Sequence, residues 1–125
     1  MSTGSRTERD LAEAYWAAEE RRDIDGIMAL YHADAVYQDA GGRVEGAADL
    51  RAWYERSASD YPRLHVDILR EYPDGDGSAI EFDATLWDRD GHPFVIRGIN
   101  LFQVSDGRFT SVRSYEDPPA PAPQR

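Results

Sequence analysis

A chain of 125 residues, 41% of them hydrophobic, has the length of one domain with a substantial core and is too short for two. It has no cysteine, and all 14 basic residues are arginines, which excludes disulfides, thiolate metal sites and nucleophilic lysines. The formal net charge of −10 repels phosphate backbones and anionic lipids, so neither nucleic acid nor a membrane is expected as a partner.

The first half of the chain is predicted to be mainly helical. Apolar residues recur at helical spacing, with breaks at residues 23–26 and 41–42. The expected elements are a helix from Thr7 up to the first break, a short helix over residues 27–31, a strand over residues 35–39 and a helix over residues 47–59.

The second half is predicted to contain strands alone. Apolar and polar residues alternate there, and the dipeptides Asp90-Gly91 and Asp106-Gly107 are typical of two-residue hairpin turns. The expected strands cover residues 64–72, 79–87, 94–104 and 109–116. Helices followed by an antiparallel meander indicate an α+β domain without a dinucleotide-binding unit.

The two ends of the chain differ from the rest. Residues 1–6 are small and polar, and residues 118–125 are rich in proline, so both segments are expected to be disordered around a single domain at 7–117. No run approaches the roughly 20 apolar residues of a membrane helix, and the start lacks the apolar core of a secretory signal. A cytoplasmic protein is therefore expected.

The Asp90-Gly91 turn predicts which residues share a face of the sheet. A two-residue turn would pair Trp87 with Phe94, and counting outward places Asp83, Thr85 and Trp87 on the face of Asn100. The opposite face would carry Ile80, Phe82, Ala84, Leu86, Ile99 and Leu101, and so large an apolar outer face predicts a homodimer through the convex side of the sheet. The inverse arrangement, with these apolar residues in the core and Asp83 in solvent, stays open.

Several stretches carry a family resemblance: YWAA at 15–18, DIDGIMALY at 23–31, DAVYQD at 34–39 and RGINLF at 97–102. Over residues 7–117 the chain resembles the ketosteroid isomerases and polyketide cyclases of the nuclear transport factor 2-like superfamily. The resemblance implies three N-terminal helices packed on a strongly curved, mainly antiparallel sheet that forms a cone with an internal pocket. The same fold carries isomerases, dehydratases, cyclases, epoxide hydrolases and binding modules.

The resemblance implies roles for three residues. Asp39 stands where the isomerases keep a general base, and Tyr15 stands where they keep a phenol that donates to the substrate oxyanion. Their third residue, an aspartic acid, is Asn100 here, and an amide can also donate to an oxyanion. The residue types alone also allow Asp39 to cap the turn before Gly41 and Tyr15 to be part of the core.

Further pocket candidates follow from the predicted register and from residue type. Asp83 falls near the position where the limonene epoxide hydrolases, which this chain resembles, have a catalytic aspartate. Glu81 stands in place of their neighbouring arginine, and Ser114 stands in place of their second aspartate. His65 shares a strand face with Asp67, as in a dehydratase-like pair, and no metal site or cofactor is implied. The residues expected to bind substrate are Trp53, Tyr54, His65, Thr85, Trp87, Phe94, Phe102 and Ser114.

Together these features predict a cofactor-independent acid/base enzyme of ketosteroid isomerase type that acts on a carbonyl-bearing cyclic or polycyclic small molecule. Asp39 would move the proton while Tyr15 and Asn100 hold the enolate. One alternative is a polyketide-type cyclase, or an epoxide-opening cyclase or hydrolase, that uses Asp39 with Asp83. The other is a non-catalytic module that binds a small apolar or aromatic ligand or dimerises.

Overall fold

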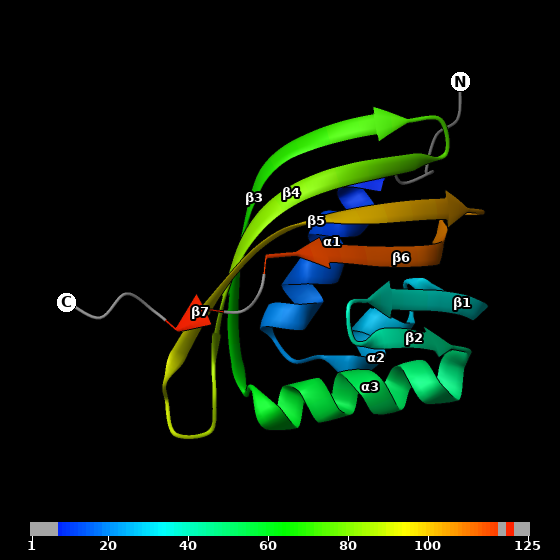
Figure 1. The fold of residues 1–125 in the computed structure, drawn as a ribbon. Coiled ribbons are helices and arrows are strands. Elements are labelled where there is room, and N and C mark those ends of the chain that lie inside the picture. The colour runs from blue at the N-terminus through cyan, green and yellow to red at the C-terminus, as the bar shows by residue number, and fades with distance from the viewer. Residues whose placement is uncertain (1–7, 118–119, 122–125) are drawn as a thin grey trace.

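The computed structural model describes residues 8–117 and 120–121. In Figure 1 the long strands of a bent sheet curve around α1, and α3 lies across the open side of the curve. The elements in chain order are α1 (Glu8–Glu20), α2 (Ile24–Met28), β1 (Tyr31–Asp39), β2 (Gly42–Glu45), α3 (Ala47–Asp60), β3 (Arg63–Asp74), β4 (Gly77–Trp87), β5 (Pro93–Ser105), β6 (Arg108–Glu116) and β7 (Ala120–Pro121).

The sheet is mixed but mostly antiparallel. Its strand order is β2-β1-β6-β5-β4-β3, β7 pairs with β5, and β1 and β6 are the parallel pair. Three helices packed on a curled sheet of this kind confirm the predicted α+β cone fold. None of the three described helices has the length and apolar character needed to cross a membrane.

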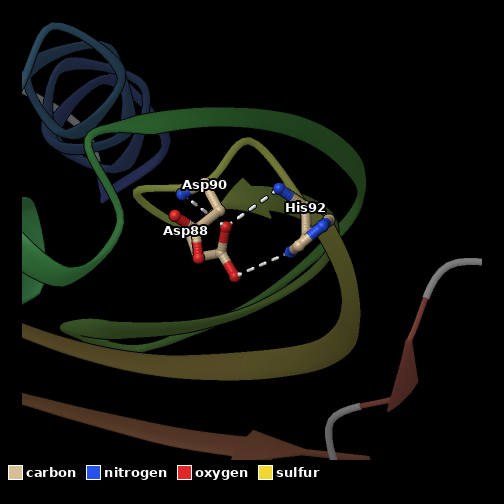
Figure 2. Close-up of side chains that lie close together, drawn as sticks. All are labelled: Asp88, Asp90 and His92. Atoms are coloured by element: carbon tan, nitrogen blue, oxygen red, sulfur yellow. Dashed lines mark hydrogen bonds and ion pairs between the residues drawn. The ribbon is translucent and has the colours of Figure 1, made fainter.

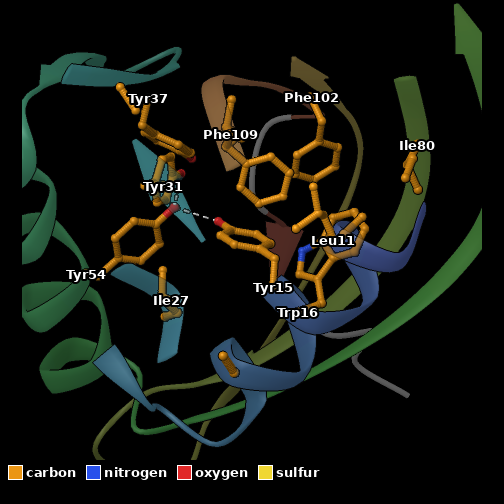
Figure 3. Packing of buried hydrophobic residues seen from close by; sticks show 14 of the residues in the cluster. Leu11, Tyr15, Trp16, Ile27, Tyr31, Tyr37, Tyr54, Ile80, Phe102 and Phe109 are labelled. Carbon is orange, nitrogen blue, oxygen red and sulfur yellow. Dashed lines mark hydrogen bonds between the residues drawn. The ribbon is translucent and has the colours of Figure 1, made fainter. Parts of the chain in front are cut away.

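Aromatic side chains fill the space between α1 and the sheet. Phe102 and Phe109 stack at 5.0 Å between ring centroids (Figure 3). Trp16 of α1 lies 5.1 Å from Phe82 of β4, also between ring centroids. These rings are buried, as is Leu11 on the same stripe of α1. The helical spacing that predicted α1 therefore marks the face that packs in the core.

The region after α1 differs from the prediction in three places. The Asp23 side chain accepts a hydrogen bond from the Gly26 amide at 3.0 Å, so the predicted break is the cap that begins α2. Tyr31 was expected at the end of a helix but begins β1, with its ring buried. The strand β1 ends at Asp39 as predicted, but the strand β2 that follows was not predicted: Asp39 pairs with Gly42, so residues 40–41 form the turn of a hairpin.

The two Asp-Gly turns have different lengths. Ser105 pairs with Arg108, which confirms the two-residue turn at Asp106-Gly107. Between β4 and β5, however, Trp87 pairs with Pro93, so the prediction of a two-residue turn at Asp90-Gly91 is wrong.

The longer β4–β5 loop is organised by Asp88. Its Oδ1 accepts hydrogen bonds from the backbone amides of Asp90 and His92, both at 2.9 Å, as Figure 2 shows. The Asp88 amide donates to the His92 carbonyl at 3.0 Å, which leaves residues 89–91 as a three-residue hairpin loop, and the φ of 85° at Gly91 suits its left-handed position. The Asp88 carboxylate, which lies outside the predicted two-residue turn, thus stabilises the longer loop.

This loop shifts the register of β4 against β5 by one residue. Because side chains alternate along a strand, the shift exchanges the two faces of β4. Asn100 pairs with Ile80, and the inner face of β4 carries Phe82, Ala84 and Leu86. The prediction that Asp83, Thr85 and Trp87 share the face of Asn100 is therefore wrong, and the predicted apolar outer face loses its four β4 members to the interior.

The outward residues of β4 have partners of their own. Both oxygens of Asp83 accept hydrogen bonds from Arg97, at 2.6 and 3.0 Å. The guanidinium of Arg63 lies 4.2 Å from the Trp87 ring centroid. Within the terminal segments expected to be disordered, residues 120–121 pair with β5. The other residues of these segments lie outside the described residues, as does the predicted helix start at Thr7.

Candidate functional site

A cavity of about 200 Å³ lies inside the cone, between α1, α3 and the inner face of the sheet. Most of its wall is apolar. The larger apolar side chains are Trp16, Trp53, Leu64, Phe82, Leu86 and Ile96. Polar groups enter from two directions: Glu19, Arg22 and Tyr15 come from α1 and the residues after it, and Asp39, Asn100, Ser114 and Glu116 come from the sheet. An apolar cavity with few convergent polar groups is the usual form of a small-molecule site.

Five of the predicted site residues line this cavity. They are Tyr15, Asp39, Trp53, Asn100 and Ser114. The resemblance had assigned chemistry to three of them, and these three come from α1, β1 and β5. The fold therefore brings Asp39, Tyr15 and Asn100 to the wall of one cavity.

The other predicted site residues lie elsewhere. Tyr54 and Phe102 are buried in the core beside the cavity, and Phe94 packs edge-to-face on Tyr61 at 6.1 Å. His65 does lie 3.0 Å from Asp67, as its spacing predicted, but this pair is exposed on β3 and does not line the cavity. The residues on the outer face of β4 are absent from the lining as well: Asp83, Thr85 and Trp87.

Asp39 ends β1 with its carboxylate held by two donors. Its Oδ1 accepts from the Gly41 amide at 2.8 Å, and its Oδ2 accepts from the Tyr37 hydroxyl at 3.2 Å. The Tyr37 ring packs on Trp53 at 4.5 Å, which anchors this donor in the cavity wall. The side chain thus both caps the hairpin turn and borders the cavity, so the two roles considered for Asp39 are compatible.

Asn100 is the polar group in the inner face of β5. The residue is 3% exposed, and its Oδ1 is buried without a hydrogen-bond partner among the described residues. Ser114 lies opposite on β6, and its hydroxyl donates to Glu116 at 2.8 Å. Burial, with a smaller contribution from nearby Asp39, raises the pKa of Glu116. An unsatisfied buried oxygen in a cavity wall is a point where a ligand can bind.

Three buried tyrosine hydroxyls meet beside the cavity, and one of the three residues, Tyr15, lines it. The Tyr54 oxygen lies 2.7 Å from that of Tyr15 and 2.6 Å from that of Tyr31, and the rings converge in Figure 3. Burial is the main cause that raises the pKa of each phenol above its ordinary value. The three hydroxyls therefore stay protonated at neutral pH and act as a connected set.

Glu19 and Arg22 complete the cavity, and neither was predicted as a site residue. Glu19 is only 9% exposed; its Oε1 accepts from Arg22 at 3.0 Å and its Oε2 accepts from the Tyr15 hydroxyl at 3.3 Å. Burial raises the pKa of the Glu19 carboxyl to about 7, against the opposing effects of Arg22 and Tyr15. The signal in the sequence was the spacing, because Glu19 follows Tyr15 by four residues on the apolar stripe of α1.

A second polar cluster lies on the β4–β5 loop. The ligand atoms of Asp88, Asp90 and His92 lie within 4.8 Å of one another, close enough to surround a metal ion. Asp88 already accepts the two loop amides, and these hydrogen bonds lower its pKa (Figure 2). The loop itself explains this cluster, and it is separate from the cavity.

Solved structures with similar folds include proteins of several activities. A hypothetical protein of ketosteroid isomerase-like fold from Catenulispora acidiphila DSM 44928, in complex with trimethylamine, is 26% identical over 87% of this chain and 86% of its own, with a TM-score of 0.78. A LEH-like epoxide hydrolase from M. tuberculosis is 27% identical over 86% of this chain and 80% of its own (TM-score 0.76). A putative polyketide cyclase from Sinorhizobium meliloti is 22% identical over 84% and 93%, with a TM-score of 0.71, and supports the fold alone. No curated protein matches the sequence.

The family model for the SnoaL-like domain matches residues 12–112, which include most of α1, both other helices and most of the sheet. The resemblance to ketosteroid isomerase-like and polyketide cyclase-like proteins is thereby confirmed at the level of family and fold. The chain belongs to the SnoaL-like domain family, within the nuclear transport factor 2-like superfamily.

Proposed function

We propose that the cavity is the active site of a cofactor-independent acid/base isomerase for a small cyclic carbonyl compound. The observation that supports this most is that one mostly apolar cavity is lined by a carboxylate, a phenol and an amide: Asp39, Tyr15 and Asn100. A carboxylate can accept a proton, and the phenol and amide can donate to an oxygen that becomes negative. Apolar walls strengthen such hydrogen bonds by excluding water.

In this mechanism Asp39 takes a proton from a carbon next to the substrate carbonyl. The electron pair of that C–H bond moves toward the carbonyl oxygen, which becomes an enolate oxygen stabilised by Tyr15 and Asn100. Asp39 then returns the proton to a different carbon of the conjugated system. No proton or electron is gained or lost, so an isomerisation needs no cofactor.

The size of the cavity narrows the substrate class. At about 200 Å³ it is smaller than the roughly 300–1,000 Å³ of typical drug-sized sites, which favours one or two rings over a polycyclic substrate. The similar Catenulispora acidiphila protein also has a small compound, trimethylamine, in its complex. The alternative chemistry that paired Asp39 with Asp83 is not retained, because Asp83 lies on the outer face with Arg97.

The decisive experiment compares Asp39→Asn with Asp83→Asn as a matched control. Turnover would be followed by absorbance as a β,γ-unsaturated ketone, cyclohex-3-enone, becomes conjugated. Binding would be measured separately by ¹⁹F NMR with 4-fluoroacetophenone, a non-reacting ketone. Asp39→Asn should bind the probe normally and lose at least about a hundredfold in kcat, because the amide has no basicity. Asp83→Asn should stay within about threefold of wild type.

Two results would overturn the proposal. If Asp39→Asn keeps kcat within about threefold of wild type, Asp39 is not the base. If the wild type binds 4-fluoroacetophenone but converts no small cyclic ketone or epoxide, the domain is a binding module and the enzyme proposal is wrong.

We also infer a homodimer formed through the outer face of the sheet. Ile99 of β5 and Tyr115 of β6 are cross-strand partners on this face, 38% and 56% exposed, and Val95 lies on the same side of β5. Adjacent exposed apolar side chains on a sheet favour burial against a second copy.

A further inference from the structure

The tyrosine hydroxyls and Glu19 form one hydrogen-bonded chain. In order, it runs Tyr31, Tyr54, Tyr15 and Glu19, with oxygen–oxygen distances of 2.6, 2.7 and 3.3 Å. Every member is buried, and Tyr15 and Glu19 also form part of the cavity wall. Each phenol has one proton to donate, and a carboxylate has none.

With Glu19 ionised, the three protons of the chain are all used inside it. Tyr15 must donate to the carboxylate, Tyr54 then donates to Tyr15, and Tyr31 donates to Tyr54. None of these three phenols is then left to donate into the cavity. If Tyr15 turned its proton to a ligand, the buried Glu19 carboxylate would keep, among the described residues, only Arg22 as a hydrogen-bond partner, and an ionised acceptor deprived of a hydrogen bond is costly.

With Glu19 protonated, the chain holds a fourth proton. Glu19 can donate to the Tyr15 oxygen while Tyr54 also donates to it, since a phenol oxygen has two lone pairs. Tyr15 then has its own proton free for a ligand in the cavity that it lines. The distances need not change for this reversal, because only the donor and acceptor roles are exchanged.

We infer that Glu19 is a positioning residue that acts through Tyr15: Tyr15 donates a hydrogen bond to a ligand carbonyl only when Glu19 carries a proton. This inference rests on the proposed function, in which Tyr15 holds the substrate oxygen. It goes beyond it by assigning control of that donor to a residue of α1 that does not itself touch the reacting atoms.

The surroundings of Glu19 allow both protonation states near neutral pH. The groups that face it are Arg22, which follows α1, Tyr15 on α1, Tyr31 on β1 and Tyr54 on α3. Arg22 also donates to the Tyr61 carbonyl, at 3.0 Å from its Nε, so its charge is shared. Desolvation outweighs this partner and raises the pKa of Glu19 to about 7, so the protonated fraction falls as pH rises past neutrality.

The test measures binding of 4-fluoroacetophenone by ¹⁹F NMR from about pH 5.5 to 8.5. Its carbonyl can only accept hydrogen bonds and does not titrate. We expect wild-type affinity to fall by roughly tenfold or more across this range, the size expected when a buried charged group loses a hydrogen bond. The infrared carbonyl stretch of the bound ketone should move to higher frequency over the same range, as the hydrogen bond from Tyr15 is lost. The analogue 1-ethyl-4-fluorobenzene, which lacks the carbonyl, should bind independently of pH.

Variants separate the role of Glu19 from a merely structural one. Glu19→Gln should keep the low-pH affinity and carbonyl frequency at every pH, because the amide can donate to Tyr15 and does not titrate. Glu13→Gln, on the exposed side of α1, should reproduce the wild-type profile. Tyr15→Phe should bind weakly at every pH. If Glu19→Gln does not fold, the pH dependence of 4-fluoroacetophenone binding in wild type, compared with that in Tyr15→Phe, still tests the inference.

The inference is overturned if wild-type affinity and carbonyl frequency do not change with pH, or if Glu19→Gln keeps the wild-type pH profile. Failure of the proposed function gives a different result. In that case no ketone is turned over, while the pH-dependent binding through Glu19 remains. Conversely, turnover that depends on Asp39 without pH-dependent binding would overturn the inference and leave the proposed function standing.

Discussion

Replacing Glu19 by glutamine should change how the stability of the domain depends on pH. Burial raises the pKa of this carboxyl from 4.5 to about 7 in the folded protein. Between these two values the folded chain binds more protons at this site than the unfolded chain does. The free energy of unfolding therefore falls as pH rises through this interval, and the loss is complete above about pH 7.

The size of the effect follows from the two pKa values. At 1.36 kcal/mol per pH unit, a rise from 4.5 to about 7 corresponds to roughly 3 kcal/mol of stability that wild type loses between acidic and neutral pH. Glu19→Gln has no titrating group at this position. The difference in free energy of unfolding, Glu19→Gln minus wild type, should accordingly increase by roughly 3 kcal/mol from pH 4.5 to pH 8. This change does not depend on how stable the variant is at pH 4.5.

Urea unfolding followed by tryptophan fluorescence at several pH values would measure this difference. Other groups, including Glu116, titrate in both proteins and cancel when the two curves are subtracted. The control is Glu13→Gln on the same helix, where the carboxylate is 53% exposed and pairs with Arg9; its difference from wild type should change by less than about 0.5 kcal/mol. A Glu19→Gln difference that stays constant from pH 4.5 to 8 would refute the raised pKa.

Three further predictions concern the core and the outer face. Gly98→Ala should lower the free energy of unfolding by about 1–3 kcal/mol, because an added Cβ would lie 2.5 Å from the Tyr115 carbonyl oxygen; urea unfolding with a loss under about 0.5 kcal/mol would contradict this contact. Tyr54→Phe should cost roughly 1–3 kcal/mol, since its hydroxyl joins two buried phenols, and an unchanged urea midpoint would argue against that network. Wild type should sediment at twice the chain mass of 14.1 kDa and Ile99→Glu as a monomer; a monomeric wild type at micromolar concentration would rule out the dimer.

Much of the fold and part of the site could be predicted from local patterns. Helical spacing identified the face of α1 that packs in the core, and alternation identified the four long strands, because both depend on residues close in sequence. The resemblance pointed to Asp39, Tyr15 and Asn100, which line one cavity. These three residues lie on α1, β1 and β5. The order of these elements along the chain could be predicted from local patterns, which is why the resemblance could be followed.

Tertiary structure decided what local patterns leave open. Two Asp-Gly dipeptides predicted the same two-residue turn. The one after Asp88 forms a longer loop, because the Asp88 carboxylate, which lies outside the dipeptide, accepts hydrogen bonds from the amides of Asp90 and His92. The loop is one residue longer than predicted, and this shifts the β4–β5 register so that Asp83 lies on the outer face instead of in the predicted pocket. The alternating pattern of β4 is compatible with both registers, and only its pairing with β5 decides between them. Glu19 was passed over for a related reason: a glutamate on a helix is usually solvated, and only packing of α1 against α3 and the sheet removes the water that would keep its pKa low.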